Sequence, residues 1–117
     1  MGTVRPETAI RAGGTDGNDK TEPDATFAPF ILTPCFPSHP SNHASGSSGG
    51  AEVLRRLYGA GGHAITLSNP GVPAISGIVL HYTTFKAITD DVDDARVYGG
   101  IHFRFEQEEG GRLGRDG

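Results

Sequence analysis

The chain of 117 residues has a single cysteine, Cys35, and no tryptophan. One cysteine cannot form a disulfide within the chain, which excludes a small fold held together by intrachain disulfides. The cysteine count does not decide whether the protein is secreted. We expect Cys35 to be a buried residue that packs as a small hydrophobe.

Long apolar runs and an excess of positive charge are also lacking. No apolar run approaches the length of a membrane span, and the N-terminus lacks the charged-then-apolar layout of a signal peptide. We therefore expect a soluble chain, and the sequence by itself indicates no compartment. Ten basic and fourteen acidic residues give a net charge of -4, without a basic patch studded with aromatic residues. This balance argues against a nucleic-acid partner.

Glycine and proline are abundant, with 18 and 8 residues. The length suits one domain, but this composition is rich in loops for a compact helical unit, which suggests that part of a domain is missing. We expect a single partial domain over residues 1–117. Its residues 1–40 should be irregular, with one short helix after Pro6, and its residues 41–117 should be the helical part.

The first strong helical signal follows a stretch of small residues. Residues 45–50 read Ser-Gly-Ser-Ser-Gly-Gly, which suits either a flexible linker or a helix packed closely against its neighbours. Glycines at positions 59 to 62 should end the helix that comes next. Its apolar stripe consists of Ala51, Val53, Leu54, Leu57 and Tyr58.

The pattern changes between residues 63 and 82. Two short apolar runs, 64–67 and 77–80, flank the turn-forming residues 69–73. Such runs predict an extended excursion or a hairpin between helices. We assign the histidines at positions 63 and 81 to local contacts.

Two further helices are predicted in the last third of the chain. Thr84 should cap the first of them, with Arg96 in its last turn. The second should begin near His102 and fray among the glycines at 110, 111, 114 and 117. The spacing of apolar residues in the first predicts a buried face made of Phe85, Ile88, Val92 and Ala95.

A candidate anion site lies around the turn between these two helices. Arg96 offers a rigid fork of donors that matches the oxygens of phosphate or a related oxyanion. His102 follows beyond Gly99-Gly100, where its ring could face the same anion. Glu106 comes four residues later, and its carboxylate could fix the tautomer of that ring, leaving the other nitrogen free.

A second candidate stretch is Pro40-Ser41-Asn42-His43. A proline followed by serine indicates a helix N-terminus, where unpaired N–H groups and the helix dipole favour an oxyanion. His39 and His43 share the spacing of paired zinc ligands, but Pro40 between them disrupts a common helical face. We expect His39 to be a surface or packing residue.

These stretches resemble the signatures of the superfamily that unites vanadium-dependent haloperoxidases with type 2 phosphatidic acid phosphatases. The third signature, arginine, five residues, histidine, three residues and an acid, is matched by Arg96, His102 and Glu106. Residues 98–105 look especially like the soluble, haloperoxidase-like bacterial members. Ala95 stands where the family usually has serine, and Glu106 stands where it usually has aspartate.

The other two signatures are matched in part. Residues 40–43 resemble the family's Pro-Ser-Gly-His, with Asn42 in place of glycine. Arg5 and Pro6 match the end of the first signature, which is lysine, six residues, arginine and proline. The lysine would fall before Met1, so we expect the chain to be the C-terminal part of a longer protein.

The resemblance implies an all-α helical bundle of the haloperoxidase and acid phosphatase type, with an anion pocket between its helices. His102 would ligate the vanadium of a vanadate cofactor, and His43 would act as acid or base. The oxyanion would be bound by Arg5, Ser41, Asn42 and Arg96, and Glu106 would support His102 from behind. The enzyme would oxidise halide with hydrogen peroxide.

Two alternatives stay open. One is a phosphatase without cofactor, in which His102 attacks the phosphorus of a phosphate ester and forms a phosphohistidine. The other is an inactive fragment that only binds oxyanions. In each case the expected partners are small molecules, and the family allows an extracytoplasmic location for the longer protein.

Overall fold

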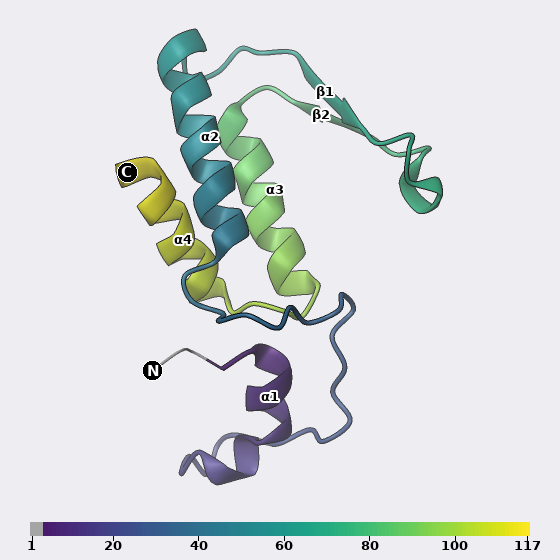
Figure 1. Ribbon diagram of the computed structural model, residues 1–117, viewed down its shortest axis with the longest axis vertical. Coiled ribbons are helices and arrows are strands. Elements are labelled where there is room, and N and C mark those ends of the chain that lie inside the picture. Colours follow the sequence, from purple (N-terminus) through teal and green to yellow (C-terminus); the bar gives the residue numbers. More distant parts are fainter. Residues whose placement is uncertain (1–3) are drawn as a thin grey trace.

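A computed structural model describes residues 4–117 and shows a helical bundle with one small β-hairpin (Figure 1). Chain order is α1 (Pro6–Arg11), the 3-10 turn η1 (Gly13–Thr15), α2 (Asn42–Tyr58), β1 (Ile65–Ser68), the 3-10 turn η2 (Pro73–Ile75), β2 (Val79–Tyr82), α3 (Phe85–Tyr98) and α4 (Arg104–Asp116). The predicted all-α bundle with an excursion near 63–82 is confirmed. No helix within residues 4–117 has the length and apolar character needed to cross a membrane.

Helices α2, α3 and α4 run side by side and form the bundle, whereas α1 lies beyond one end of it (Figure 1). The short helix predicted after Pro6 is present, with Pro6 at its first position. A long irregular segment leads from α1 back to the start of α2. The N-terminal end of α2, the C-terminal end of α3 and the start of α4 therefore meet at the end of the bundle that faces α1.

Helix α2 begins directly after Ser41, whose hydroxyl accepts a hydrogen bond from the Ala44 N–H at 3.3 Å. The helix continues without interruption through residues 45–50, so the close-packed helix, and not the flexible linker, is the correct alternative. Its buried residues are Ala44 and Ser48. The predicted apolar stripe is instead largely exposed, with Leu57 and Tyr58 each 68% accessible.

Small residues let α4 approach α2 closely. A Cβ atom at Gly110 would lie 2.6 Å from the Ser41 carbonyl oxygen, and one at Gly114 would clash with the Ser45 carbonyl. The prediction that α4 frays among its glycines is therefore wrong, since the helix runs to Asp116. Close backbone packing against α2 outweighs the low helix propensity of glycine.

The predicted excursion is an antiparallel hairpin, with Ile65 opposite Tyr82 and Ser68 opposite Val79. It projects sideways from the top of α2 and α3 (Figure 1). Most of its strand residues are exposed, because within the described chain no second layer covers them.

Helix α3 is capped as expected, with the Thr84 hydroxyl accepting from the Ala87 N–H at 3.0 Å. Its buried face differs from the prediction. Thr89 is buried, Phe85, Ile88 and Val92 are half-buried, and Ala95 is exposed. The prediction was therefore wrong for Ala95, which lies near the C-terminal end of α3.

Cys35 is exposed, so the expectation of a buried cysteine is wrong. It lies in the irregular segment between η1 and α2, outside any helix or strand. Position in an open loop, rather than the apolar character of the side chain, decides its exposure.

Candidate functional site

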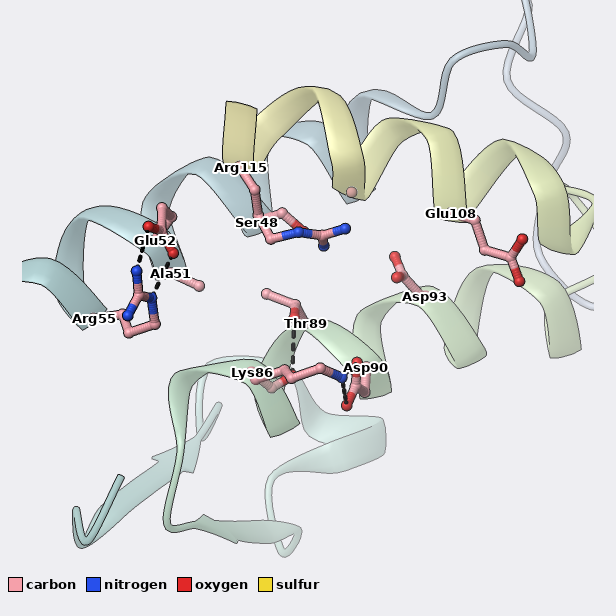
Figure 2. Close-up of a pocket in the computed structure, with 11 residues that line it drawn as sticks. Ser48, Ala51, Glu52, Arg55, Lys86, Thr89, Asp90, Asp93, Glu108 and Arg115 are labelled. Atoms are coloured by element: carbon pink, nitrogen blue, oxygen red, sulfur yellow. Dashed lines mark hydrogen bonds and ion pairs between the residues drawn. The ribbon is translucent and has the colours of Figure 1, made fainter. Parts of the chain in front are cut away.

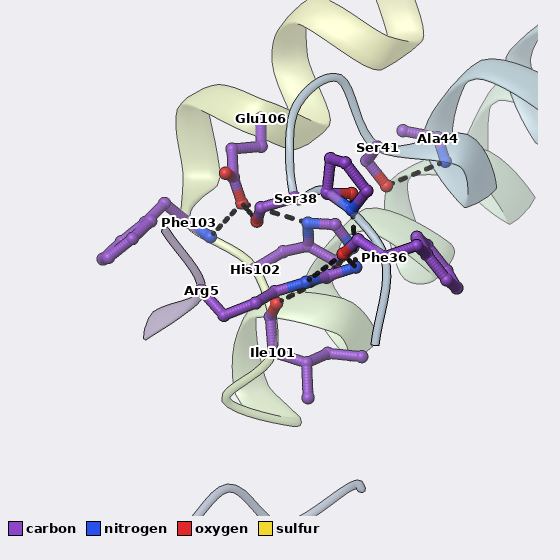
Figure 3. Close-up of polar contacts among 10 residues, drawn as sticks. Arg5, Phe36, Ser38, Ser41, Ala44, Ile101, His102, Phe103 and Glu106 are labelled. Carbon is purple, nitrogen blue, oxygen red and sulfur yellow. Dashed lines mark hydrogen bonds and ion pairs between the residues drawn. The ribbon is translucent and has the colours of Figure 1, made fainter. Parts of the chain in front are cut away.

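Three parts of the chain that are distant in sequence meet at the end of the bundle. Arg5 at the start of α1, residues 36–41 before α2, and His102 in the turn between α3 and α4 lie together (Figure 3). Gly100 has a φ of 76°, a left-handed conformation that glycine adopts without strain, and it bends the chain between the two helices. The predicted glycine bend thus places His102 between the helix ends.

The two ring nitrogens of His102 have different partners. Arg5 Nη1 lies 2.9 Å from His102 Nε2, and His102 Nδ1 lies 3.0 Å from Glu106 Oε2. Because guanidinium can only donate, Nε2 must be the acceptor and Nδ1 must carry the proton. His102 is 3% exposed, so this arrangement is screened from water. The expected contact between Glu106 and the ring is therefore present.

Glu106 is fully buried and ionised. Its Oε2 accepts hydrogen bonds from the Ser38 hydroxyl at 2.6 Å, from the Phe103 N–H at 3.0 Å and from His102. Burial opposes ionisation, but the hydrogen bonds from these three donors outweigh it and lower the pKa of Glu106. The carboxylate also caps α4 through the Phe103 N–H, which explains how a residue inside the helix contacts a histidine that precedes it.

Arg5 is buried at the start of α1, as its N-cap residue, and its side chain is held by backbone carbonyls. Its guanidinium donates to the Ile101 carbonyl at 2.9 Å and to the Phe36 carbonyl at 3.0 Å. Burial lowers the pKa of Arg5, although the Glu106 carboxylate raises it in part. A buried guanidinium without a direct carboxylate partner is a favourable site for an external anion.

Arg96 lies in the last turn of α3, as predicted. Its Nε is buried and has no hydrogen-bond partner among the described residues. Burial lowers the pKa of Arg96, and the positive charge of Arg5 lowers it further. Two guanidinium groups thus act on one another across the end of the bundle, where the Glu106 carboxylate offsets the positive charge only in part.

His43 is the second residue of α2 and is exposed. Burial of part of the ring lowers the pKa of His43, and the positive charges of Arg96 and Arg5 lower it further. The pKa of His102 is also lowered, chiefly by burial, with Glu106 opposing and both arginines contributing. The structure therefore brings both histidines into the field of the same two guanidinium groups, and both rings stay neutral at neutral pH.

The start of α2 adds hydrogen-bond donors to this cluster. Ser41 is fully buried, and its hydroxyl keeps its own proton after accepting from Ala44. Asn42 is the first residue of the helix, so its backbone N–H has no partner within the helix. The Ser41 N–H donates to the Glu106 carbonyl at 3.2 Å, which ties α2 to α4 at this point.

Sequence reasoning missed Ser38, which is fully buried and contacts Glu106. A lone serine in a proline-rich loop carries no distinguishing signal, and its partner is 68 residues away in the chain. The remaining histidines lie elsewhere. His39 is exposed, with its ring centroid 5.9 Å from that of Phe105, while His63 and His81 make local contacts near the hairpin.

A separate groove of about 490 Å³ lies between α2, α3 and α4 (Figure 2). Its walls include the Lys86–Asp90 ion pair and the paired Glu52 and Arg55. None of the predicted anion-site residues lines it. The groove is therefore distinct from the cluster around His102.

The fold is a helical bundle in which Arg5 and Glu106 both contact His102 at one end, and the charges of Arg5 and Arg96 lower the pKa of His43 there. The family model described as VCPO second helical-bundle domain matches residues 1–116. The chain therefore belongs to the vanadium haloperoxidase family, as a helical-bundle domain. No curated protein sequence matches it.

Solved structures agree with this assignment. The chain is 28% identical to a bacterial vanadium-dependent iodoperoxidase, with a TM-score of 0.77, covering 97% of this chain and 25% of that one. Apo and holo forms of a bacterial vanadium-dependent chloroperoxidase are 20% and 22% identical, with TM-scores of 0.71 and 0.72, and share the fold. Each match covers 97% of this chain and 28% of the chloroperoxidase, so the chain spans about a quarter of these proteins.

Proposed function

We propose that this chain carries the vanadate-binding and catalytic residues of a vanadium-dependent haloperoxidase that oxidises halide with hydrogen peroxide. The observation that supports it best is the environment of His102. Its Nδ1 donates to Glu106, while its Nε2 lone pair points toward a buried guanidinium. Because Nδ1 carries the proton, Nε2 is the nitrogen that would ligate vanadium, with Arg5 turning its donors from Nε2 to the vanadate oxygens.

The residues around His102 fit a vanadate anion. Arg5 and Arg96 would donate to its oxygens, and the unpartnered Nε of Arg96 supports this role. Ser41 and the N–H of Asn42 would add donors from the start of α2, where the helix dipole is positive. These interactions would offset the negative charge of the anion in a partly buried site.

When bound, vanadate supplies an electrophilic centre that activates hydrogen peroxide toward attack by halide. His43 stays neutral because burial and the two arginines lower its pKa. A neutral imidazole can accept a proton from peroxide, and its protonated form can return that proton to a departing oxygen. The role of Glu106 is to keep His102 in one tautomer throughout.

The proposal is tested with the longer protein that contains this chain. Given vanadate, hydrogen peroxide and bromide, this protein should brominate a phenolic dye. The reaction is measured as a change in the absorbance of the dye. Hydrolysis of a phosphomonoester without halide oxidation would favour the phosphatase with a phosphohistidine at His102. Binding of oxyanions without either reaction would favour the inactive alternative.

A further inference from the structure

Ser38 is a buried polar residue of this region that the proposed function leaves without a role. It is fully buried although it lies in an irregular segment. Its hydroxyl donates to Glu106 Oε2 at 2.6 Å, as Figure 3 shows. Hydroxyl donors to carboxylates at such short distances form strong, charge-assisted hydrogen bonds.

The three donors to Glu106 Oε2 come from two parts of the chain. Phe103 N–H and His102 Nδ1–H belong to the same turn that carries the histidine. Ser38 approaches from the separate segment before α2. Its hydrogen bond is thus the one that fixes the carboxylate relative to a second, independent part of the structure.

The same segment also holds Arg5. The Phe36 carbonyl accepts from Arg5 Nη2 at 3.0 Å, and the Pro37 carbonyl accepts from it at 3.4 Å. Residues 36–38 therefore fix both groups that flank the His102 ring, the guanidinium at Nε2 and the carboxylate at Nδ1. A displacement of this segment would loosen both contacts together.

We propose that Ser38 is a positioning residue, whose hydroxyl holds the Glu106 carboxylate so that His102 keeps its proton on Nδ1 and its lone pair on Nε2. The consequence for anion binding rests on the proposed function, whereas the tautomer of His102 does not. Residues that orient a ligand histidine in this way commonly change affinity by about tenfold to a hundredfold when they are removed.

The test compares Ser38→Ala with Ser48→Ala in the longer protein. Ser48 is also a buried serine, 2% exposed, but its hydroxyl has no hydrogen-bond partner among the described residues. Nitrogen NMR of labelled histidine reports the ring protonation of His102. We expect Ser38→Ala to give a mixture of tautomers and to weaken vanadate binding by about tenfold, while Ser48→Ala leaves both unchanged.

Ser38→Cys covers the case in which Ser38→Ala fails to fold. The thiol fills a similar volume but donates weakly, so its effects should fall between those of serine and alanine. A second check uses Glu106→Gln, since Ser38 acts through that carboxylate. In that background, Ser38→Ala should produce little further change in the ring or in vanadate affinity.

The role of Ser38 would be overturned if the Ser38→Ala or Ser38→Cys variant kept both the Nδ1–H tautomer of His102 and the vanadate affinity of the unsubstituted protein. Equal effects of Ser38→Ala and Ser48→Ala would do the same, because loss of any buried hydroxyl would then suffice. If the unsubstituted protein binds no vanadate, the proposed function fails, but the tautomer measurement still decides the role of Ser38.

Discussion

At the scale of single residues, the environment of His102 is set by two opposite contacts. The Glu106 carboxylate stabilises a proton on Nδ1, while Arg5 and burial disfavour a second proton on Nε2. A histidine on the surface would exchange between both tautomers and would be partly charged near neutral pH. The buried site therefore fixes the direction of the Nε2 lone pair, which accepts from Arg5 in this structure and would be needed for ligation of vanadium or attack on phosphorus.

His102→Ala should abolish halide oxidation, or phosphate-ester hydrolysis if that is the reaction, because no other residue offers the same nitrogen. The measurement is kcat/KM for the longer protein with bromide and peroxide. His39→Ala is the matched control, since His39 is exposed and contacts Phe105 rather than the cluster. Comparable losses in the two variants would mean that the ligand was assigned wrongly.

Stability should fall as the pH is lowered from about 6.5, the ordinary pKa of histidine. The folded protein holds His102 and His43 neutral with lowered pKa values, so the unfolded chain binds more protons in this range. The buried His102 contributes a slope of at most about 1.4 kcal/mol per pH unit, which ends below its folded pKa, and the exposed His43 contributes less because solvent screens it. Urea unfolding at a series of pH values measures this change in the free energy of unfolding with pH.

His102→Gln provides the comparison for this pH dependence. It removes the more buried of the two titrating rings, so the slope between pH 6.5 and the folded pKa should decrease. An unchanged slope, or stability that increases on acidification through this window, would contradict the assignment of a neutral, buried His102.

At the scale of elements, the contact between α2 and α4 depends on small residues. Ser41, Ala44 and Ser45 on α2 or its cap face Gly110 and Gly114 on α4. The closeness of these helices brings the Ser41 N–H to the Glu106 carbonyl and so joins the N-terminal end of α2 to the carboxylate behind His102. Packing of the two helices and geometry of the site are therefore linked.

Gly110→Ala should destabilise the fold by about 1–3 kcal/mol, because the added methyl group forces the helices apart. Its Cβ would lie 2.6 Å from the Ser41 carbonyl oxygen and 2.9 Å from the Ala44 methyl group. The measurement is the free energy of unfolding in urea. We also expect weaker vanadate binding, since Ser41 is displaced.

Gly46→Ala is the control for this substitution. Gly46 also lies inside a helix, but a Cβ atom there meets nothing within 4 Å. Alanine at an open helical position should stabilise the protein by about 0.5–1 kcal/mol. If Gly110→Ala were equally stabilising, the close approach of α2 and α4 would be refuted.

At the scale of the whole molecule, much apolar surface is uncovered. Phe30 is 93% exposed, Leu32 is 90% exposed, and Leu57 is 68% exposed. The chain spans about a quarter of the length of the haloperoxidases that it matches. That residues 1–117 are one partial domain, with an irregular part up to residue 40 and a helical part from residue 41, stays a prediction.

The 117-residue chain by itself should show weak or no halide oxidation. Arg5 reaches the cluster from α1, which lies outside the bundle, and Arg96 has an unpartnered buried nitrogen. In this chain Arg5 lies against His102 Nε2, the nitrogen that vanadate would need, so the observed arrangement is not the one that catalysis requires. Assays of the short chain and the longer protein under identical conditions measure this, and comparable turnover would overturn the prediction.

The sequence by itself determined the type of most elements and the identity of the cluster. Three features depend only on residues close together in the sequence and could be predicted from it. They are the cap at Thr84, the strands of the hairpin and the glycine bend before His102. The resemblance to the family signatures predicted that Arg5, His43, Arg96 and His102 belong to one anion site. Their catalytic roles remain predictions.

Only the tertiary structure decided which residues are buried and how the cluster is supported. Two features depend on a neighbour that is distant in sequence: α4 continues through its glycines, and Ser38 contacts Glu106. Two others depend on the absence of such a neighbour among the described residues: Cys35 is exposed, and so is the apolar stripe of α2. Burial is a property of how segments meet in space, and a single sequence records it only where periodicity happens to match the final packing.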